Sequence, residues 1–558
     1  MNFALTSTPE LNTTPAYTNP ILAGFYPDPS ICRKDDEYFL VCSTFAYFPA
    51  IPVFHSYDLV NWKLAGHVLD RTTQLDLTGF GVSKGIFAPS IRHHDGLFYC
   101  TCTLVDGKGN FVVTAVDPAG PWSDPVWLPN VKGIDPSLFF EENGQAWLVY
   151  NSAAPHDKAL YNGHRTIRMR SFDPVLLQAQ DDEIILVNGG TDISKKPIWI
   201  EGPHLLQRKD FFYLIAAEGG TGFDHSVVVF RSKSIEGPFI PYEKNPVLCQ
   251  SHLAAERAFP VTSTGHADLV DAGKDNWQAV FLGCRPYDGD HYNTGRETFL
   301  VPVTWTDDWP LLNEGKEDVG YRYGLPLPEK KQDGYNRRSG NFSYRDDFND
   351  TSLNEEWTFL RTPHSRWYEL AELKGFVSLK LRPDTCAGRS NPSLLARRQQ
   401  HLSCSARTAL LFRATDENEK AGLLVFQNED HFYFLCQSVK NDRPFIQLYR
   451  SQLMPRDESA MKLVLEHEIE IADRELLSLQ ITAEKDRYHF YYCMGKNNWS
   501  LLAKDIDARF LSTRTAGGFV GCIFGVYATS LGKPSINKAH FDWFEYEGMD
   551  EVWEGGRE

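Results

Sequence analysis

Residues 28–44 read DPSICRKDDEYFLVCST, which is a Pro-containing turn, an apolar strand, a charged tip (KDDE) and a second, aromatic-rich strand. A polar tip between two strand-forming runs is typical of a β-hairpin. The same pattern returns at 88–103 (APSIRHHDGLFYCTCT), 135–152 (DPSLFFEENGQAWLVYNS), 201–220 (EGPHLLQRKDFFYLIAAEGG) and 265–283 (GHADLVDAGKDNWQAVFLG). A spacing of about 45 to 65 residues between copies is compatible with one propeller blade each.

A further predicted strand and turn follow each hairpin and complete the repeat. These segments run into an acidic or Gly-Pro turn, and most end on an aromatic residue: FHSYDLVNW (54–62), VVTAVDPAGPW (112–122), IRMRSFDP (167–174), VVVFRSKSIEGPF (227–239) and FLVPVTWTDDWP (299–310). Five blades of about four strands predict an all-β fold with a five-bladed β-propeller over 18–323. Long amphipathic helical patterns are absent from this stretch, which argues against a (β/α)₈ barrel.

The repeat does not continue after the propeller. Residues 324–342 are polar and rich in Pro and Gly, and they are expected to be a linker. Alternating strands separated by short turns then return over 343–558, as in AGLLVFQNEDHFYFLCQSV (421–439). This pattern predicts a C-terminal β-sandwich of the jelly-roll, concanavalin A-like kind.

Charge and composition exclude several classes of partner. The chain has 558 residues and a net charge of −17, from 73 acidic and 56 basic residues, which disfavours nucleic acid and anionic membranes. No apolar run is long enough for a transmembrane helix. The start of the sequence has neither a basic nor an apolar segment of a secretory signal, so a cytoplasmic protein is expected. The 11 cysteines show no metal-ligand spacing and are expected to be reduced.

The repeat also predicts where chemistry should occur. The first strand of each propeller blade lines the central channel, so the opening residues of the five copies should surround one funnel: Asp28, Ala88, Asp135, Glu201 and His266 (or Gly265). Glycosidic cleavage needs one carboxylic acid and one carboxylate, and a third carboxylate nearby can raise the pKa of the acid. An Asp-Pro pair alone is more often a turn, but three buried carboxylates without a function would be costly. These residues alone leave catalysis and cation binding both open.

Several ordered motifs resemble one enzyme family. They are NPILAGFYPDPSICR (19–33), GIDPSLFF (133–140), WIEGPHLL (199–206), GHADLV (265–270) and GRETFL (295–300). Together they resemble glycoside hydrolase family 43, in its two-domain branch of β-xylosidases and α-L-arabinofuranosidases. The resemblance covers nearly the whole chain, because those enzymes also carry a C-terminal β-sandwich.

The resemblance implies a role for individual residues. Asp28 would be the general base that activates water, Glu201 the general acid, and Asp135 the residue that tunes and orients the acid. Residues implied to bind substrate are Phe45, Phe87, Ala88, Arg296 and His266. His266 would also lie beside a divalent cation, commonly calcium, on the propeller axis. Phe87 departs from the pattern, since many relatives have Trp at this position, and this leaves the exact pentose open.

The implied activity is exo-acting, inverting release of xylose from xylobiose and longer β-1,4-xylo-oligosaccharides. The alternatives are an α-L-arabinofuranosidase, alone or as a second activity, and a non-catalytic sugar-binding propeller. The sandwich is expected to narrow the mouth of the site, and Phe519 is a candidate for the loop that reaches it, although a core strand is the other interpretation. Members of the family that the chain resembles often form dimers or tetramers, so a homo-oligomer is expected.

Overall fold

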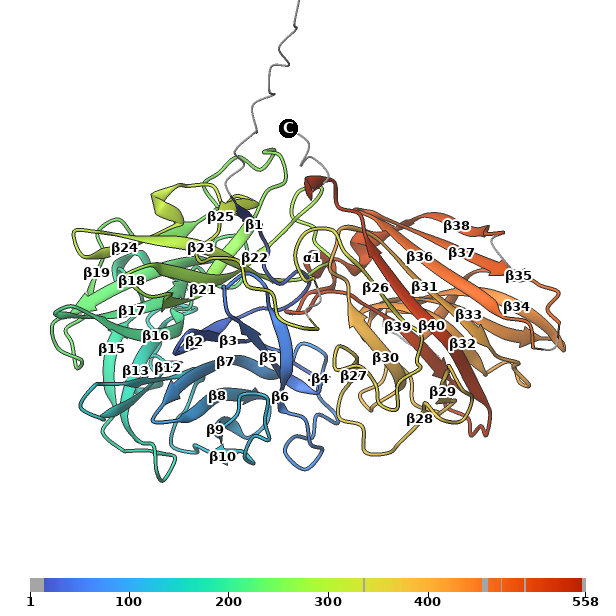
Figure 1. The fold of residues 1–558 in the computed structure, drawn as a ribbon, viewed down its shortest axis with the longest axis horizontal. Coiled ribbons are helices and arrows are strands. Elements are labelled where there is room, and N and C mark those ends of the chain that lie inside the picture. The colour runs from blue at the N-terminus through green and yellow to red at the C-terminus, as the bar shows by residue number, and fades with distance from the viewer. Residues whose placement is uncertain (1–14, 335–336, 454–459, 473, 496–497, 554–558) are drawn as a thin grey trace, which may run out of the picture.

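The computed structural model describes residues 15–553, except 335–336, 454–459, 473 and 496–497. The propeller and the sandwich lie side by side, and almost every element is a strand (Figure 1). The described helical segments are α1 (Thr513–Ala516) and short 3₁₀ turns at Pro155–Asp157, Ile193–Lys195, Asn313–Gly315, Ala508–Leu511 and Glu551–Trp553. The predicted fold class, an all-β propeller followed by a sandwich, is confirmed.

Each of the five blades is an antiparallel sheet built from strands that follow one another in the chain, except that blade 1 omits β4. Blade 1 contains β2 (Ser30–Lys34), β3 (Glu37–Val41), β5 (Ala50–Ser56) and β6 (Lys63–Leu69). Blade 2 contains β7 (Gly85–His94), β8 (Leu97–Val105), β9 (Gly109–Ala115) and β10 (Val126–Trp127). Blade 3 contains β11 (Ile134–Phe140), β12 (Ala146–Ala153) and β13 (Arg165–Asp173), with β14 (Gln178–Ala179) and β15 (Ile184–Asn188) both paired to β13. Blade 4 contains β16 (Glu201–Arg208), β17 (Phe211–Glu218) and β18 (Ser226–Ser232), with β19 (Ile240–Pro241) and β20 (Leu248–Cys249) on β18. Blade 5 contains β21 (Thr262–Asp271), β22 (Trp277–Cys284), β23 (Glu297–Thr306) and β24 (Trp309–Leu312).

The first strands of the blades form the closed inner ring that the repeat predicts. Contacts run from β2 to β7, β11, β16, β21 and back to β2. Polar groups on these strands join at the axis. Asp268 accepts hydrogen bonds from Ser30 Oγ (2.8 Å) and Arg92 Nη1 (2.8 Å), and Arg92 Nη2 lies 3.0 Å from His204 Nδ1. Asp268 is only 2% exposed, so this is a buried network that holds the blades in register.

Among the described residues no strand is exchanged between the first and last blades, and the chain before blade 1 closes the ring instead. β1 (Ala16–Thr18) pairs with β25 (Arg322–Gly324). Asn19 Nδ2 donates to the carbonyl of Leu300 in blade 5 (2.8 Å), and Asn19 Oδ1 accepts from the Leu300 amide (3.0 Å). The Tyr17 hydroxyl donates to the same carbonyl (2.8 Å). The segment that enters blade 1 is thus fixed on blade 5.

The sandwich packs two eight-stranded antiparallel sheets against each other. One sheet has the order β28 (Tyr368–Glu369), β29 (Val377–Lys380), β40 (Lys538–Gly548), β31 (Ser403–Leu411), β36 (Leu477–Glu484), β37 (Arg487–Met494) and β38 (Ser500–Asp507), with β26 (Ser343–Asp346) on β40. The other has the order β35 (Met461–Glu468), β34 (Arg443–Ser451), β33 (His431–Lys440), β32 (Lys420–Asn428), β39 (Ile523–Thr529), β30 (Ser393–Arg398), β27 (Thr358–Leu360) and β4 (Tyr47–Phe48). The segment predicted as the linker, 324–342, starts at the last residue of β25 and ends before β26.

The two domains are joined by a common β-sheet and by buried polar contacts across their interface. Strand β4 lies between propeller strands in sequence but pairs with β27 of the sandwich (Figure 1). Arg361 of the sandwich is fully buried, donates from Nε to the Phe80 carbonyl of the propeller (2.7 Å) and pairs with Glu429. Glu429 in turn accepts from the Val82 amide (3.0 Å). The sandwich is therefore anchored close to the start of blade 2.

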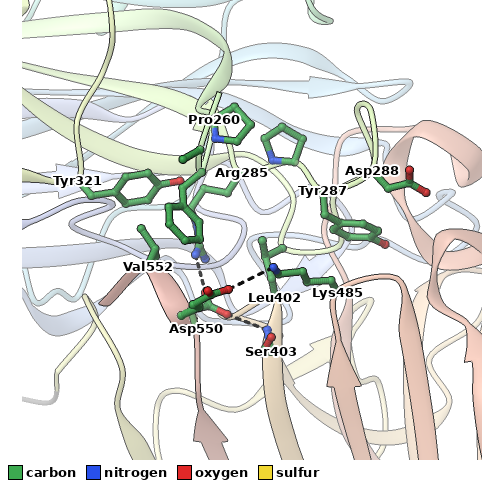
Figure 2. Close-up of a pocket in the computed structure, with 14 residues that line it drawn as sticks. Pro260, Arg285, Tyr287, Asp288, Tyr321, Leu402, Ser403, Lys485, Asp550 and Val552 are labelled. Atoms are coloured by element: carbon green, nitrogen blue, oxygen red, sulfur yellow. Dashed lines mark hydrogen bonds and ion pairs between the residues drawn. The ribbon is translucent and has the colours of Figure 1, made fainter. Parts of the chain in front are cut away.

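A second anchor is a buried ion-pair cluster at the other side of the interface. Arg285 of the propeller donates to Glu297 (2.6 Å) and to Asp550 at the end of the sandwich (2.6 Å). A cavity of about 360 Å³ opens beside this cluster, lined by both domains (Figure 2). Because Arg285 pairs with a carboxylate from each domain, Glu297 and Asp550, we interpret the cluster as structural.

Two further expectations can be compared with the fold. In the part of the chain that the structure describes, no helix is long and apolar enough to cross a bilayer. All 11 cysteines lie in the described ranges, and every one is unpaired.

Candidate active site

A backbone irregularity recurs where each blade begins. The φ angle is positive at Asp28 (55°), Ala88 (35°), Asp135 (58°) and His266 (50°), and in blade 4 at Gly202 (56°), next to Glu201. The register of β7, β11, β16 and β21 shifts at these same places. Bulges re-aim side chains, and left-handed backbone at residues other than Gly clusters at functional sites. The repeat therefore turns one side chain per blade toward a common centre.

Asp28 is a buried carboxyl whose negative charge is compensated by its neighbours. Its Oδ2 accepts a hydrogen bond from Ser43 Oγ (2.5 Å), and Ser43 Oγ accepts from the Ala88 amide (2.7 Å). Its Oδ1 lies 3.5 Å from Arg296 Nη1 and 3.8 Å from His266 Nδ1. Burial raises the pKa of Asp28, but Arg296, His266 and the Ser43 hydrogen bond outweigh it, and the pKa falls below the ordinary value. Asp28 is consequently ionised at neutral pH.

Glu201 shows the opposite shift. Its side chain is buried, and burial, then the charge of Asp135, then that of Asp28 raise its pKa to about 8. The nearest ionisable ring is that of His225, whose Nε2 lies 4.0 Å from Glu201 Oε1. At neutral pH Glu201 therefore carries a proton that it can donate, while Asp28 can accept one.

Asp135 links these two groups. Its Oδ2 accepts a hydrogen bond from the Gly202 amide (3.0 Å), directly after Glu201, and its own amide donates to Thr103 Oγ1 (3.2 Å). Burial is the main cause that raises the pKa of Asp135. The carboxyl thus fixes the backbone that carries Glu201 and adds negative charge beside it.

An aromatic wall built from both domains closes one side of the site. Phe45 and Phe87 meet edge to face with ring centroids 5.2 Å apart, and Phe519 lies 6.1 Å from Phe45 and 5.6 Å from Phe87. Phe519 comes from the sandwich, and its amide donates to Ser83 Oγ of the propeller (3.0 Å). The Arg296 guanidinium lies 5.2 Å from the Phe519 ring. Of the two interpretations of Phe519, the structure supports the loop that reaches the site.

Comparison with known proteins now identifies the chain. Residues 17–310 match the model of the glycosyl hydrolases family 43, and residues 345–547 match that of the β-xylosidase C-terminal concanavalin A-like domain. The chain belongs to glycoside hydrolase family 43.

Relatives match it from end to end. A xylosidase/arabinosidase of Butyrivibrio fibrisolvens is 38% identical over 95% of this chain and 99% of its own length. A non-reducing end α-L-arabinofuranosidase of Bacteroides ovatus is 36% identical over 96% of this chain and 95% of its own length. The crystal structure of a xylan β-1,4-xylosidase from Bacillus halodurans superposes with a TM-score of 0.85, at 30% identity, over 95% of this chain and all of the other.

In this family 43 hydrolase the predicted site residues converge. Arg296 and His266 contact the Asp28 carboxylate, and Ala88 reaches it through Ser43. Asp135 contacts the backbone next to Glu201, and Phe45 and Phe87 form the wall. All of them are at most half-exposed in the described structure. Their proximity is a geometric finding, and their individual roles stay proposals.

Sequence reasoning missed His225. Its ring is 1% exposed, and Nδ1 lies 3.3 Å from the Ser263 carbonyl, to which it donates. The lone pair of Nε2 therefore faces Glu201. Burial, with Arg296 and His266, lowers the pKa of His225 to about 3, which keeps the ring neutral. A Cβ on Gly265 would lie 2.4 Å from this ring, so the Gly before His266 makes the room.

The resemblance to family 43 implies no cofactor for the chemistry itself, and a structural or activating divalent cation such as calcium beside His266 on the propeller axis. Calcium takes about six to eight oxygen ligands. Over residues 15–553, leaving out the undescribed gaps, no group of three or more His, Cys, Asp or Glu side chains could hold a metal ion. Near the axis Asp268 is occupied by the guanidinium of Arg92, and Asp28 by Arg296 and Ser43. Calcium here would need water for most of its ligands, so a calcium ion beside His266 stays a prediction.

Proposed function

We propose that the protein is an exo-acting, inverting glycosidase that releases xylose from the non-reducing end of β-1,4-xylo-oligosaccharides such as xylobiose. The observation that carries the proposal is the divergence of two carboxyl groups in one funnel. The pKa of Asp28 is lowered, whereas that of Glu201 is raised to about 8. Two carboxyls held in opposite protonation states are what glycosidic hydrolysis requires.

The proposed mechanism follows from these states. Asp28 takes a proton from a water molecule as that water attacks the anomeric carbon. Glu201 gives its proton to the glycosidic oxygen, so the bond to the leaving sugar breaks on the opposite face and the configuration inverts. Asp28 then holds a proton that Glu201 lacks, and exchange with solvent restores the starting state. Burial, and after it the charge of Asp135, keeps Glu201 protonated between turnovers.

Substrate orientation is assigned to the groups around Asp28. Arg296 and His266 face its Oδ1 and can donate to sugar hydroxyls while they hold the carboxylate in place. Phe45, Phe87 and Phe519 offer apolar faces to the ring of the terminal sugar. Because one side of this wall comes from the sandwich, the funnel is narrowed, which supports action on chain ends rather than within a chain.

A second activity, on α-L-arabinofuranosides, is also supported. The relatives from B. fibrisolvens and B. ovatus carry arabinosidase or arabinofuranosidase in their names. Phe87 is smaller than Trp and lacks the indole N–H donor, so the wall next to Phe45 is less constrained at this position.

The proposal is tested by incubating the purified protein with xylobiose and with 4-nitrophenyl α-L-arabinofuranoside, beside the variants Asp28→Ala and Glu201→Ala. We expect xylobiose to be cleaved and both variants to lose this activity. If only the arabinoside is cleaved, the mechanism stands and the main substrate is wrong. If neither substrate is cleaved while xylose still binds, the protein is a sugar-binding propeller and the carboxyl roles are withdrawn.

A further inference from the structure

The His225 ring presents a buried hydrogen-bond acceptor beside the acid. Because Nδ1 donates to the Ser263 carbonyl (3.3 Å), Nε2 carries the lone pair. Nε2 is buried, and in the part of the chain that the structure describes it has no hydrogen-bond partner. Glu201 Oε1, at 4.0 Å, is too far away for a hydrogen bond. An unpaired buried acceptor is costly, which points to a partner from outside the chain.

The backbone around His225 holds this acceptor in place. The His225 amide donates to the Gly222 carbonyl (3.0 Å), directly before β18. On the other side, a Cβ on Gly265 would lie 2.4 to 2.5 Å from three atoms of the ring, so the imidazole lies against the Gly265 backbone. Since Nδ1 is also fixed on Ser263, the lone pair of Nε2 is held toward Glu201.

Arg296 supplies a buried donor close to this acceptor. Burial is the main cause that lowers the pKa of His225, and the charge of Arg296 is the next, so the two groups are close. The guanidinium reaches Asp28 through Nη1 (3.5 Å), whereas its Nε is buried and, over the described ranges, makes no hydrogen bond. A hydroxyl group both accepts and donates, so it suits an unpaired donor and an unpaired acceptor together. A carboxylate or an ammonium group could satisfy only one of them.

The position of His225 selects which hydroxyl it can meet. Glu201 protonates the glycosidic oxygen, so a group 4.0 Å from its carboxyl lies near the anomeric carbon. The His225 ring is 1% exposed and therefore belongs to the buried end of the funnel, where an exo-acting enzyme holds the terminal sugar. On that sugar, the 2-hydroxyl is the hydroxyl next to the anomeric carbon.

We propose that His225 determines specificity by accepting a hydrogen bond, at Nε2, from the 2-hydroxyl of the terminal sugar. This inference rests on the proposed function and adds a recognition residue to it. Positive charge develops at the anomeric carbon in the transition state, so the 2-hydroxyl becomes a stronger donor and its hydrogen bonds strengthen. The contact should therefore act on kcat more than on KM. The pKa of about 3 keeps the ring neutral and able to accept.

The test compares 4-nitrophenyl β-D-xylopyranoside with its 2-deoxy analogue, in the wild type and in His225→Phe, which keeps a planar ring but has no acceptor. For this variant we expect kcat on the parent xyloside to fall about 30- to 100-fold, while KM changes less than about threefold. On the 2-deoxy substrate the loss in kcat should be less than about threefold, because the hydroxyl that the histidine binds is missing. His225→Gln, whose amide oxygen can accept in place of Nε2, should recover part of the loss.

His540→Phe is the matched control, because His540 is a half-buried ring of β40 whose Nδ1 lies 2.7 Å from Ser378 Oγ in the sandwich. It should leave both substrates unaffected. Equal losses on both substrates for His225→Phe would assign the ring a structural role and overturn the inference, and so would no loss on either. If His225→Phe does not fold, the smaller His225→Leu takes its place and is read in the same way. A wild-type protein that cleaves neither xyloside would instead refute the proposed function itself.

Discussion

Replacing Asp135 by Asn tests how the acid stays protonated. The amide keeps the size of the side chain and can still accept from the Gly202 amide, but it removes the negative charge. Burial is the largest cause of the raised pKa of Glu201, and Asp135 is the next. The variant should therefore keep the burial effect and lose the largest electrostatic one.

The size of the effect can be worked out from these causes. A like charge within about 4–6 Å shifts a pKa by about one to three units, so we expect the alkaline limb of kcat/KM to move down from about pH 8 by about 1.5 units. At pH 8 the protonated fraction of Glu201 would drop from about one half to about 3%, which is about a 15-fold loss. At pH 5.5 both forms would be more than about 90% protonated, so this part of the loss disappears.

The assay is a pH profile of kcat/KM on xylobiose between pH 4.5 and 9 for the wild type and Asp135→Asn. Glu218→Gln is the matched control, because Glu218 is a half-buried carboxyl on β17 whose pKa is raised by burial and which binds Thr191. It should leave the alkaline limb in place. A uniform loss for Asp135→Asn at every pH, with an unmoved limb, would refute the electrostatic role of Asp135.

Three further changes have defined outcomes. Glu201→Gln should stabilise the fold at high pH, because the pKa of Glu201 is raised to about 8 in the folded state and the stability that the carboxyl contributes is fully present below about pH 4.5 and lost as the pH rises through about 8. In urea unfolding, the gain in the free energy of unfolding of the variant over the wild type should be about 2–4 kcal/mol larger at pH 8 than at pH 4.5. An equal gain at both pH values would contradict this. Phe519→Ala should raise KM for xylobiose about tenfold without moving the pH limbs, since it removes the sandwich's ring from the wall, and unchanged steady-state kinetics would show that the wall is complete without it. Arg285→Met should destabilise the protein by about 3–5 kcal/mol, because Glu297 and Asp550 would lose their buried partner; urea midpoints within error of the wild type would show that the cluster is dispensable.

The propeller and the positions of its central carboxyls could be predicted because the information is local. A blade is a series of adjacent hairpins, and turn residues with alternating strands reveal them in sequence. The opening residue of each blade then falls at the axis by repetition alone, as with Asp28, Asp135 and Glu201. The positive φ at Asp28 and Asp135 is an added detail that the repeat does not reveal.

Other features depend on contacts between distant segments and have no local signal. Strand β4 joins a sandwich sheet through residues more than three hundred positions away, and Phe519 reaches the wall from the far end of the chain. His225 has no motif of its own, and only the folded chain brings its Nε2 to 4.0 Å from Glu201 Oε1. A homo-oligomeric assembly, a cytoplasmic location and a divalent cation beside His266 stay predictions from the sequence.

The central claim is that Asp28 and Glu201 act from opposite faces of the bond as base and acid. The most direct measurement is proton NMR of xylobiose hydrolysis, recorded early enough to see the first anomer of the new xylose before mutarotation. The account predicts α-xylose as the first product, and no product with Asp28→Ala or Glu201→Ala. First release of β-xylose would mean retention, which would contradict the roles assigned to both residues.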